Sequence, residues 1–209
     1  MRLKFIRTCF LAMMSMMLLS SCATLSEEEC RIADWQTIGY EDGLRGLLTS
    51  RISQHREACA DVGVKPDLQS YLAGHKRGLV QFCVPNKGFD LGRRGGRYNG
   101  VCSGPAEHEF LRGYRSGQQI HQLVTKINNL KRSMDQLHKE QHEFEDEIKS
   151  NEELIVADST SPKLRKELLK QNKKLEQLIL EKDIQIRNLD SRVHRLQYQA
   201  DRLTANFQP

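Results

Sequence analysis

Aromatic residues make up only 6% of this 209-residue chain, and no cysteine occurs after Cys102. Charged residues reach 28%, and this combination is typical of helical proteins with long solvated faces rather than of thick sheet sandwiches. The net charge of +5 is small, and part of it lies in the first few residues. We therefore predict no nucleic-acid partner.

Recognisable catalytic motifs are also missing. The sequence has no nucleophile elbow, phosphate-binding loop, dinucleotide fingerprint or metalloprotease motif. Of the seven histidines, His138 and His142 are spaced to share a helical face, but both fall on or near the solvated flank of the heptad pattern described below. We expect them to be surface residues, and we predict no enzyme, no cofactor and no metal site.

The N-terminal segment is where the chain is most apolar. Basic residues within the first seven positions precede an apolar run of eleven residues, Cys9 to Leu19, which is typical of a secretory signal and too short to span a membrane. The run ends in Leu18-Leu19-Ser20-Ser21-Cys22, which resembles the lipobox of bacterial lipoproteins. That resemblance implies removal of residues 1–21 and acylation of Cys22, with 22–29 as a short tether. An ordinary secretory signal cleaved nearby is the alternative.

Four cysteines remain beyond Cys22 and before residue 103: Cys30, Cys59, Cys83 and Cys102. An even number in an exported segment predicts two disulfides, with three pairings open. Structural zinc is the other interpretation, but no pair has the short spacing of a zinc site.

Glycine recurs with aromatic residues between residues 30 and 117. An aromatic residue is followed after three or four positions by a glycine, and after four more by another, in four copies: Trp35-Gly39-Gly43, Tyr71-Gly74-Gly78, Phe89-Gly92-Gly96 and Phe110-Gly113-Gly117. Glycines four apart lie on one helical face, where another backbone can come close. We expect helices to begin at Asp34 and at Pro66-Asp67, and we expect the Gly92–Gly96 copy to lie in a loop.

Residues 84–104 contain six glycines, so we predict a long irregular loop held by Cys83 and Cys102. This loop carries four basic residues, Lys87, Arg93, Arg94 and Arg97. Guanidinium groups suit phosphate and carboxylate ligands, so the loop is a candidate anion site. The alternative is a solvated basic loop.

The rest of the chain has a heptad pattern. Apolar residues dominate positions a and d, here called the seam, from Ile120 to Ile155 and again from Leu168 to Phe207, with a break at 157–162. Two helices separated by so short a break favour an antiparallel hairpin, with Leu203 and Phe207 reaching back toward Gly113 and Gly117. A parallel dimer is the alternative.

Residues 22–118 are similar to an uncharacterised family of bacterial lipoproteins with a Cys/Gly-repeat domain of unknown function. The features that carry this resemblance are the lipobox, the spacing of Cys30, Asp34, Trp35, Gly39, Asp42 and Gly43, and the later glycine copies. The resemblance implies no activity and no site residues. The expected fold is mostly α, with a disulfide-stapled helical domain over 30–118 and a coiled-coil hairpin over 119–207.

These features together predict a lipid-anchored protein at the periplasmic face of the bacterial outer membrane, a location that Ala23 after the acylated cysteine implies by resemblance. Its expected role is that of a structural or adaptor protein of the cell envelope. Expected contacts are the membrane through the lipid and an envelope protein or the cell wall through the coiled coil, which can also serve homo-oligomerisation. The alternative is a periplasmic inhibitor or envelope-stress sensor that binds through the disulfide domain.

Overall fold

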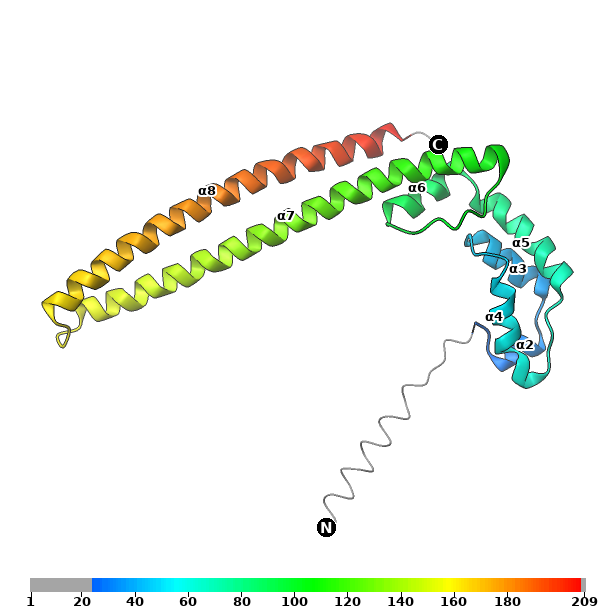
Figure 1. Cartoon of the computed structure of the whole chain (residues 1–209), viewed down its shortest axis with the longest axis horizontal. Coiled ribbons are helices and arrows are strands. Elements are labelled where there is room, and N and C mark those ends of the chain that lie inside the picture. Colours follow the sequence, from blue (N-terminus) through cyan, green and yellow to red (C-terminus); the bar gives the residue numbers. More distant parts are fainter. Residues whose placement is uncertain (1–23, 208–209) are drawn as a thin grey trace, which may run out of the picture. The chain divides into compact units, whose positions relative to one another are not determined.

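The computed structural model describes residues 24–207, and every regular element in that range is a helix (Figure 1). In chain order these are α2 (Glu27–Arg31), α3 (Trp35–Leu44), α4 (Arg51–Ala58), the short 3-10 helix η2 (Ala60–Val62), α5 (Leu68–Phe82), α6 (Pro85–Arg93), α7 (Gly104–Val156) and α8 (Pro162–Asn206). The chain forms two compact units: residues up to 84 with 98–104, and residues 85–97 with 105 onward. The mostly α fold with a disulfide-stapled part and a long helical hairpin is confirmed.

The first unit is built on the pair α3 and α5. Aspartates cap both helices: Asp34 accepts a hydrogen bond from the Gln36 amide at 3.0 Å, and Asp67 accepts one from the Gln69 amide at 2.9 Å. Such caps satisfy amides that the first helical turn leaves unpaired. Both predicted helix starts are therefore confirmed.

Glycines bring α3 and α5 into backbone contact. A methyl group built on Gly39 would lie 2.0 Å from the carbonyl oxygen of Tyr71, and one on Gly74 would lie 1.9 Å from that of Gln36. Gly43 and Gly78 make equally close approaches further along the same two helices. The first two glycine copies thus form one helix crossing that only glycine permits.

The same construction recurs in the second unit, between α6 and the start of α7. A methyl group on Gly88 would lie 2.1 Å from the Phe110 carbonyl oxygen, and one on Gly117 would lie 2.2 Å from that of Phe89. Gly92 and Gly113 complete the crossing. In each of the four helices a glycine is followed directly by an aromatic residue or a histidine, and the next glycine comes three positions after that residue. The two units therefore repeat one packing motif.

Two predictions fail at α6. Residues 84–104 are not one irregular loop, because Pro85–Arg93 is helical, and the third glycine copy pairs Gly88 with Gly92 rather than Gly92 with Gly96. Glycine disfavours an isolated helix by about 1 kcal/mol per residue, which is why the composition indicated a loop. Close packing on α7 stabilises the helix instead. Gly96 does lie beyond the helix, as expected.

Disulfides join Cys30 to Cys59 and Cys83 to Cys102, with Cα–Cα separations of 5.5 and 5.6 Å. The first connects α2 with the end of α4, and its two half-cystines are almost fully buried beside Trp35 and Tyr71. The sequence left three pairings open, and the structure selects the one that joins neighbours in sequence order.

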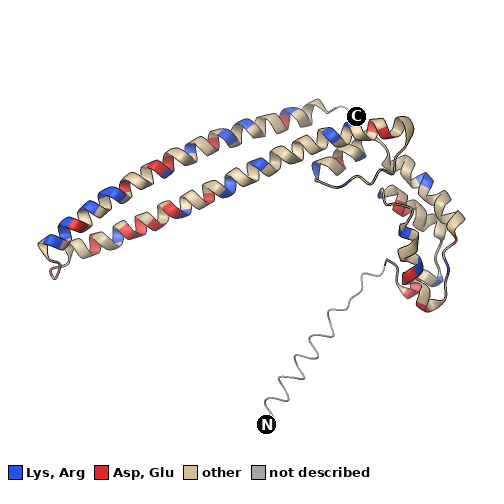
Figure 2. Cartoon of the chain, viewed as in Figure 1, with Lys and Arg blue, Asp and Glu red and all other residues tan. Residues whose placement is uncertain are grey.

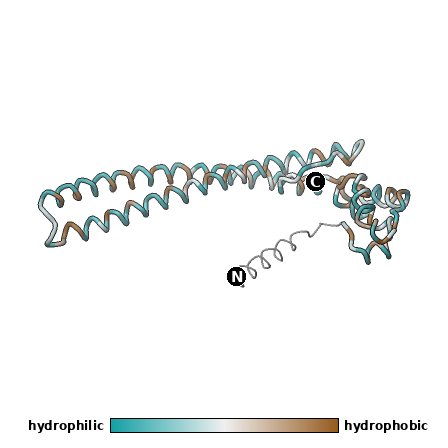
Figure 3. The backbone as a smooth tube through the Cα atoms, turned by 60° about the horizontal axis from the view of Figure 1, so that its bottom comes forward, coloured by the Kyte–Doolittle hydropathy of each residue, from teal (hydrophilic) through white to brown (hydrophobic). Residues whose placement is uncertain are grey.

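Helices α7 and α8 run antiparallel within one chain (Figure 1). Val156 ends α7, and Ser161 caps α8, which begins at Pro162. The bend is fastened by Arg165, whose guanidinium donates to the carbonyl oxygens of Ala157 and Thr160 at 2.9 and 3.1 Å. Apolar residues recur along both helices (Figure 3).

Polar residues in the seam fix the register of the hairpin. The buried Asn151 side chain donates to Asn172 at 2.8 Å, Gln141 donates to the Ile179 carbonyl oxygen at 3.2 Å, and Lys182 pairs with Glu140. A buried amide pair selects one alignment because any slip leaves both amides without a partner. At the open end, Phe207 stacks on Phe89 at 4.1 Å between ring centroids. Phe89 is also the residue whose carbonyl oxygen lies against Gly117. Phe207 therefore packs next to Gly117, as the heptad pattern predicted.

The predicted domain division between 118 and 119 falls inside α7, which continues without a break from the glycine crossing into the hairpin. The compact units divide the chain at 84/85, 97/98 and 104/105 instead.

Candidate functional site

A groove runs between α7 and α8 in the second unit. Three hollows follow one another along the two helices, with volumes of about 440, 550 and 690 Å³. The first and second share Lys126 and Gln199, and the second and third share Asn129. The groove, as named here, therefore extends from Gln119 to Leu137 on α7 and from Asn206 back to Gln185 on α8.

Leucines form the floor of the groove in three layers. Each hollow contains one leucine from each helix: Leu123 with Leu203, Leu130 with Leu196, and Leu137 with Leu189. Successive layers are seven residues apart, and all six side chains are only partly buried. By contrast, Ile120, Ile127, Ile186, Val193 and Ala200 at the other seam positions are buried. One series of seam residues thus closes the hairpin, while the other remains open to solvent.

Cations form the rim of the groove: Lys126, Arg132, Arg192, Arg195 and Arg202. All five are exposed, and none of them takes part in an ion pair in the described part of the chain. No carboxylate is among the residues lining the three hollows. The remaining polar groups there are amides, such as Gln122 and Gln199, and the hydroxyl of Ser133. The groove therefore combines an apolar floor with an uncompensated positive rim.

Charge is distributed differently at the far end of the hairpin, near the bend. There α7 is mainly acidic and α8 mainly basic (Figure 2). Residues 135–156 contain eight acidic and two basic residues, and residues 162–182 contain seven basic and three acidic residues. Acid and base face each other across the seam, as in the Glu140–Lys182 pair. Free positive charge is consequently concentrated at the groove end of the hairpin.

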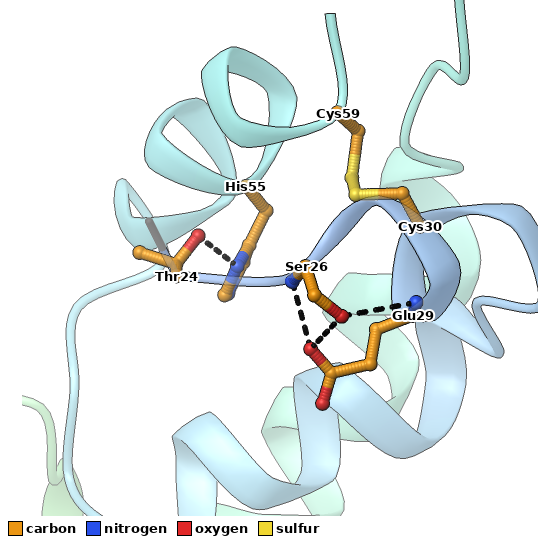
Figure 4. The surroundings of a disulfide bond; sticks show 6 residues. All are labelled: Thr24, Ser26, Glu29, Cys30, His55 and Cys59. Carbon is orange, nitrogen blue, oxygen red and sulfur yellow. Dashed lines mark hydrogen bonds between the residues drawn. A yellow bond between two sulfur atoms is a disulfide. The ribbon is translucent and has the colours of Figure 1, made fainter. Parts of the chain in front are cut away.

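A buried polar network lies in the first unit. The Asp42 Oδ2 atom accepts hydrogen bonds from the Tyr71 hydroxyl and from His55 Nε2, both at 2.8 Å. On the other side of the ring, His55 Nδ1 lies 2.8 Å from the Thr24 hydroxyl (Figure 4). Asp42, His55 and Tyr71 are all buried. They come from α3, α4 and α5 respectively, so the network ties three helices to the start of the described chain.

Both ring nitrogens of His55 are occupied by protein groups. Nε2 bonds to the Asp42 carboxylate and Nδ1 to the Thr24 hydroxyl, each at 2.8 Å. No ring nitrogen is left to take a proton from a substrate, so the geometry indicates an anchoring role. Shortly after Thr24 in the chain, Ser26 and Glu29 form a capping box that starts α2.

Burial alone would raise the pKa of Asp42, but the hydrogen bonds from His55 and Tyr71 outweigh it and lower that pKa below its usual range. The pKa of Tyr71 is raised, mainly by burial and secondly by the hydrogen bond to the Asp42 carboxylate. The network therefore holds Asp42 as a carboxylate and Tyr71 as a neutral phenol.

We expect the contribution of Asp42 to stability to disappear in acid. Because the folded pKa is lower than the unfolded one, the contribution is fully present above the unfolded value of about 4 and is lost as the pH falls through the folded value. Urea unfolding followed between pH 2 and 6 should show the stability difference between the native chain and Asp42→Asn shrinking below about pH 4. A difference that stays constant over this range would contradict the prediction.

The predicted basic residues do not form one site. Arg93 pairs with Asp90 at 3.7 Å, and the Arg94 side chain donates to the Asp90 carbonyl oxygen at 3.2 Å. Lys87 and Arg93 belong to α6, whereas Arg94 and Arg97 follow it, and all four are exposed. An anion contact there stays a prediction.

His138 and His142 are exposed, and His142 lies 3.6 Å from Glu145. Among residues 24–207 no three side chains are grouped to hold a metal ion, and no helix there is long and apolar enough to cross a bilayer. Cys22 and the residues before it lie outside the described residues.

A further hollow of about 550 Å³ lies in the first unit, between the end of α4 and the start of α5. Its apolar lining comes from Ile52, Val64, Pro66 and Leu68, and the cations Arg56 and Lys65 stand beside them.

Sequence reasoning missed both the polar network and the open groove. For the network, the available signal was Asp42 itself, an acid inside a helix on the glycine face that packs against α5. For the groove, the signal was the set of five cations flanking the leucine positions of the heptads without acidic partners.

Comparison with known proteins adds one match. No curated protein and no solved structure matches the chain. Residues 34–119 match the model of a family described as "Protein of unknown function (DUF2799)". The matched segment contains both glycine crossings and the polar network residues Asp42, His55 and Tyr71, and it ends where the groove begins.

Proposed function

We propose that this protein is a lipid-anchored adaptor of the bacterial cell envelope, held at the periplasmic face of the outer membrane, whose hairpin engages a partner. The groove between α7 and α8 carries this proposal, because it leaves a row of seam leucines open in a hairpin that is otherwise closed within one chain. Partly exposed apolar rows with a polar rim occur at interaction surfaces.

The lipobox sequence supports the anchor, and the two disulfides are consistent with an oxidising compartment. Thr24 lies only two residues after Cys22, and its hydroxyl is bonded to His55. An acyl group on Cys22 would thus be only two residues along the chain from a residue of the first unit. Helix α7, with 53 residues, is about 80 Å long at 1.5 Å per residue, which gives the hairpin a long reach.

Cys22→Ser should release the protein from membranes completely, since several acyl chains make an anchor effectively permanent and no described helix can replace it. Fractionation of cells followed by carbonate washing measures this. Ser20→Ala, a neighbouring change that keeps the cysteine, is the control and should stay bound. A Cys22→Ser protein that still sediments with washed membranes would show that the anchor lies elsewhere.

Site-specific photo-crosslinking in intact cells tests the adaptor role. A photoreactive residue at Gln122 or Gln185 on the groove, or at Leu154 or Leu169 elsewhere on the hairpin, should give discrete adducts with an envelope component. Adducts from Leu68 alone would support a second candidate function, that of a periplasmic inhibitor or stress sensor. The hollow beside Leu68 in the disulfide-stapled unit favours this candidate. No adduct from any hairpin position would overturn the adaptor proposal.

A further inference from the structure

We propose that the groove receives an acidic amphipathic α-helix of a partner protein, which packs as a third helix against α7 and α8. This inference rests on the proposed function, since it takes the hairpin as the binding part, and it adds the chemistry of the partner.

The floor of the groove has the geometry of a coiled-coil surface. The layers Leu123/Leu203, Leu130/Leu196 and Leu137/Leu189 repeat every seven residues on both helices. A third helix whose apolar residues also repeat every seven positions can insert one side chain between each pair of layers. From the first to the third layer the floor spans 14 residues, or about 21 Å at 1.5 Å per residue. Four turns of helix are enough to cover it.

The rim selects the charge of that helix. Lys126 and Arg132 flank the floor on α7, and Arg192, Arg195 and Arg202 flank it on α8. In coiled coils the residues flanking the seam choose partners by charge. With cations on both sides and no acid among the lining residues, the complementary helix carries Glu or Asp at both flanking positions.

A second copy of this chain fits the groove poorly. Pairing the groove with itself about a two-fold axis would bring five cations against five, and like-charge contacts of this kind are unfavourable. The acidic stretch of α7 near the bend is already matched by the basic start of α8 in its own hairpin, as the Glu140–Lys182 pair illustrates. A partner helix from another protein meets neither difficulty.

Binding of a designed probe to the full mature chain tests the inference. The probe is a fluorescent 21-residue peptide with Leu at heptad positions a and d and Glu at the flanking positions, and its matched control has Lys in place of Glu. We expect the Glu peptide to bind, as measured by fluorescence anisotropy, and the Lys peptide not to bind. Raising the salt concentration should weaken binding, because exposed charges are screened.

Charge reversal locates the binding surface. Arg192→Glu with Arg195→Glu should weaken binding of the Glu peptide by about tenfold or more, given typical energies of exposed ion pairs. Lys173→Glu with Lys174→Glu, the same change on α8 outside the groove, should leave it unchanged. Arg192→Gln with Arg195→Gln removes the charge without introducing acid, and circular dichroism verifies that each variant stays helical. Equal weakening by both reversals, or no weakening by either, would refute the groove as the site.

Three further results would also overturn the inference. The vesicle experiment below uses the chain without its acyl group, so that the lipid anchor itself does not insert into the vesicles. Binding of this chain to phosphatidylglycerol vesicles through Arg192 and Arg195, with no binding of the Glu peptide, would assign the groove to anionic lipid. Sedimentation equilibrium showing a dimer that Leu130→Glu dissociates would assign it to a second copy. In-cell adducts from Leu154 or Leu169 but not from Gln122 or Gln185 would refute the groove as the binding site and leave the adaptor role intact.

Discussion

Replacing Gly74 with alanine should lower the free energy of unfolding of the first unit by about 3 kcal/mol, the upper part of the range for overpacked interiors. The added methyl group would lie 1.9 Å from the Gln36 carbonyl oxygen, and Tyr40 is also within 3 Å. Both neighbours are backbone of α3, which cannot turn away as a side chain can. The helices must therefore separate, exposing the apolar residues that their contact covers.

Trp35, the single tryptophan of the chain, is buried in the first unit and reports its unfolding by fluorescence. Ala73→Gly, at the exposed neighbouring position of the same helix, is the control and should cost about 1 kcal/mol through helix propensity alone. A Gly74→Ala protein no less stable than this control in urea would show that α3 and α5 do not make the close backbone contact described.

Removing the carboxylate of Asp42 should cost still more, about 3–5 kcal/mol for Asp42→Ala. The substitution leaves two buried groups, the Tyr71 hydroxyl and His55 Nε2, without the acceptor that both use at 2.8 Å. A buried polar group with no partner costs about 1–3 kcal/mol, and the two losses arise together. The start of α4 and the contact with Thr24 should loosen at the same time.

Asp61→Ala provides the matched control, because Asp61 is an exposed acid of the same unit and surface substitutions of this kind change stability by less than about 0.5 kcal/mol. Tyr71→Phe combined with Asp42→Ala should be less destabilising than the sum of the two single changes, since one of the unpaired donors is then absent. Strict additivity in urea unfolding would argue that the two residues do not share a network.

Helix periodicity made the hairpin predictable from the sequence. The apolar repeat from Ile120 onward and the short break at 157–162 favoured two helices that pair antiparallel over a parallel dimer. Local capping chemistry likewise gave the starts of α3 and α5 at Asp34 and Asp67. These features depend on residues close together in the chain, or on a period that a single helix imposes.

Features that depend on contacts between distant segments were less accessible. Helix α6 contains Gly88 and Gly92, which oppose helix formation locally and become favourable only against Gly113 and Gly117. Helix propensity alone therefore gave a loop. Cysteine spacing could not choose among the three pairings, and the union of Asp42, His55 and Tyr71 requires the relative positions of three helices. The open side of the seam was hidden because apolar residues occupy both series of seam positions, and the heptad period alone does not tell which series is covered.

The central claim is that α7 and α8 close within one chain and leave their basic groove open to a partner. Spin labels at Thr125 and Gln197, exposed positions of α7 and α8 that do not line the groove, measure this by pulsed electron–electron dipolar spectroscopy. Cys30, Cys59, Cys83 and Cys102 are held in disulfides and do not take up label. We expect a short distance between the labels that persists when labelled chains are diluted with unlabelled ones. We also expect the distance to be retained when the Glu peptide is bound. A dipolar signal that vanishes on dilution would place the contact between chains and contradict the account.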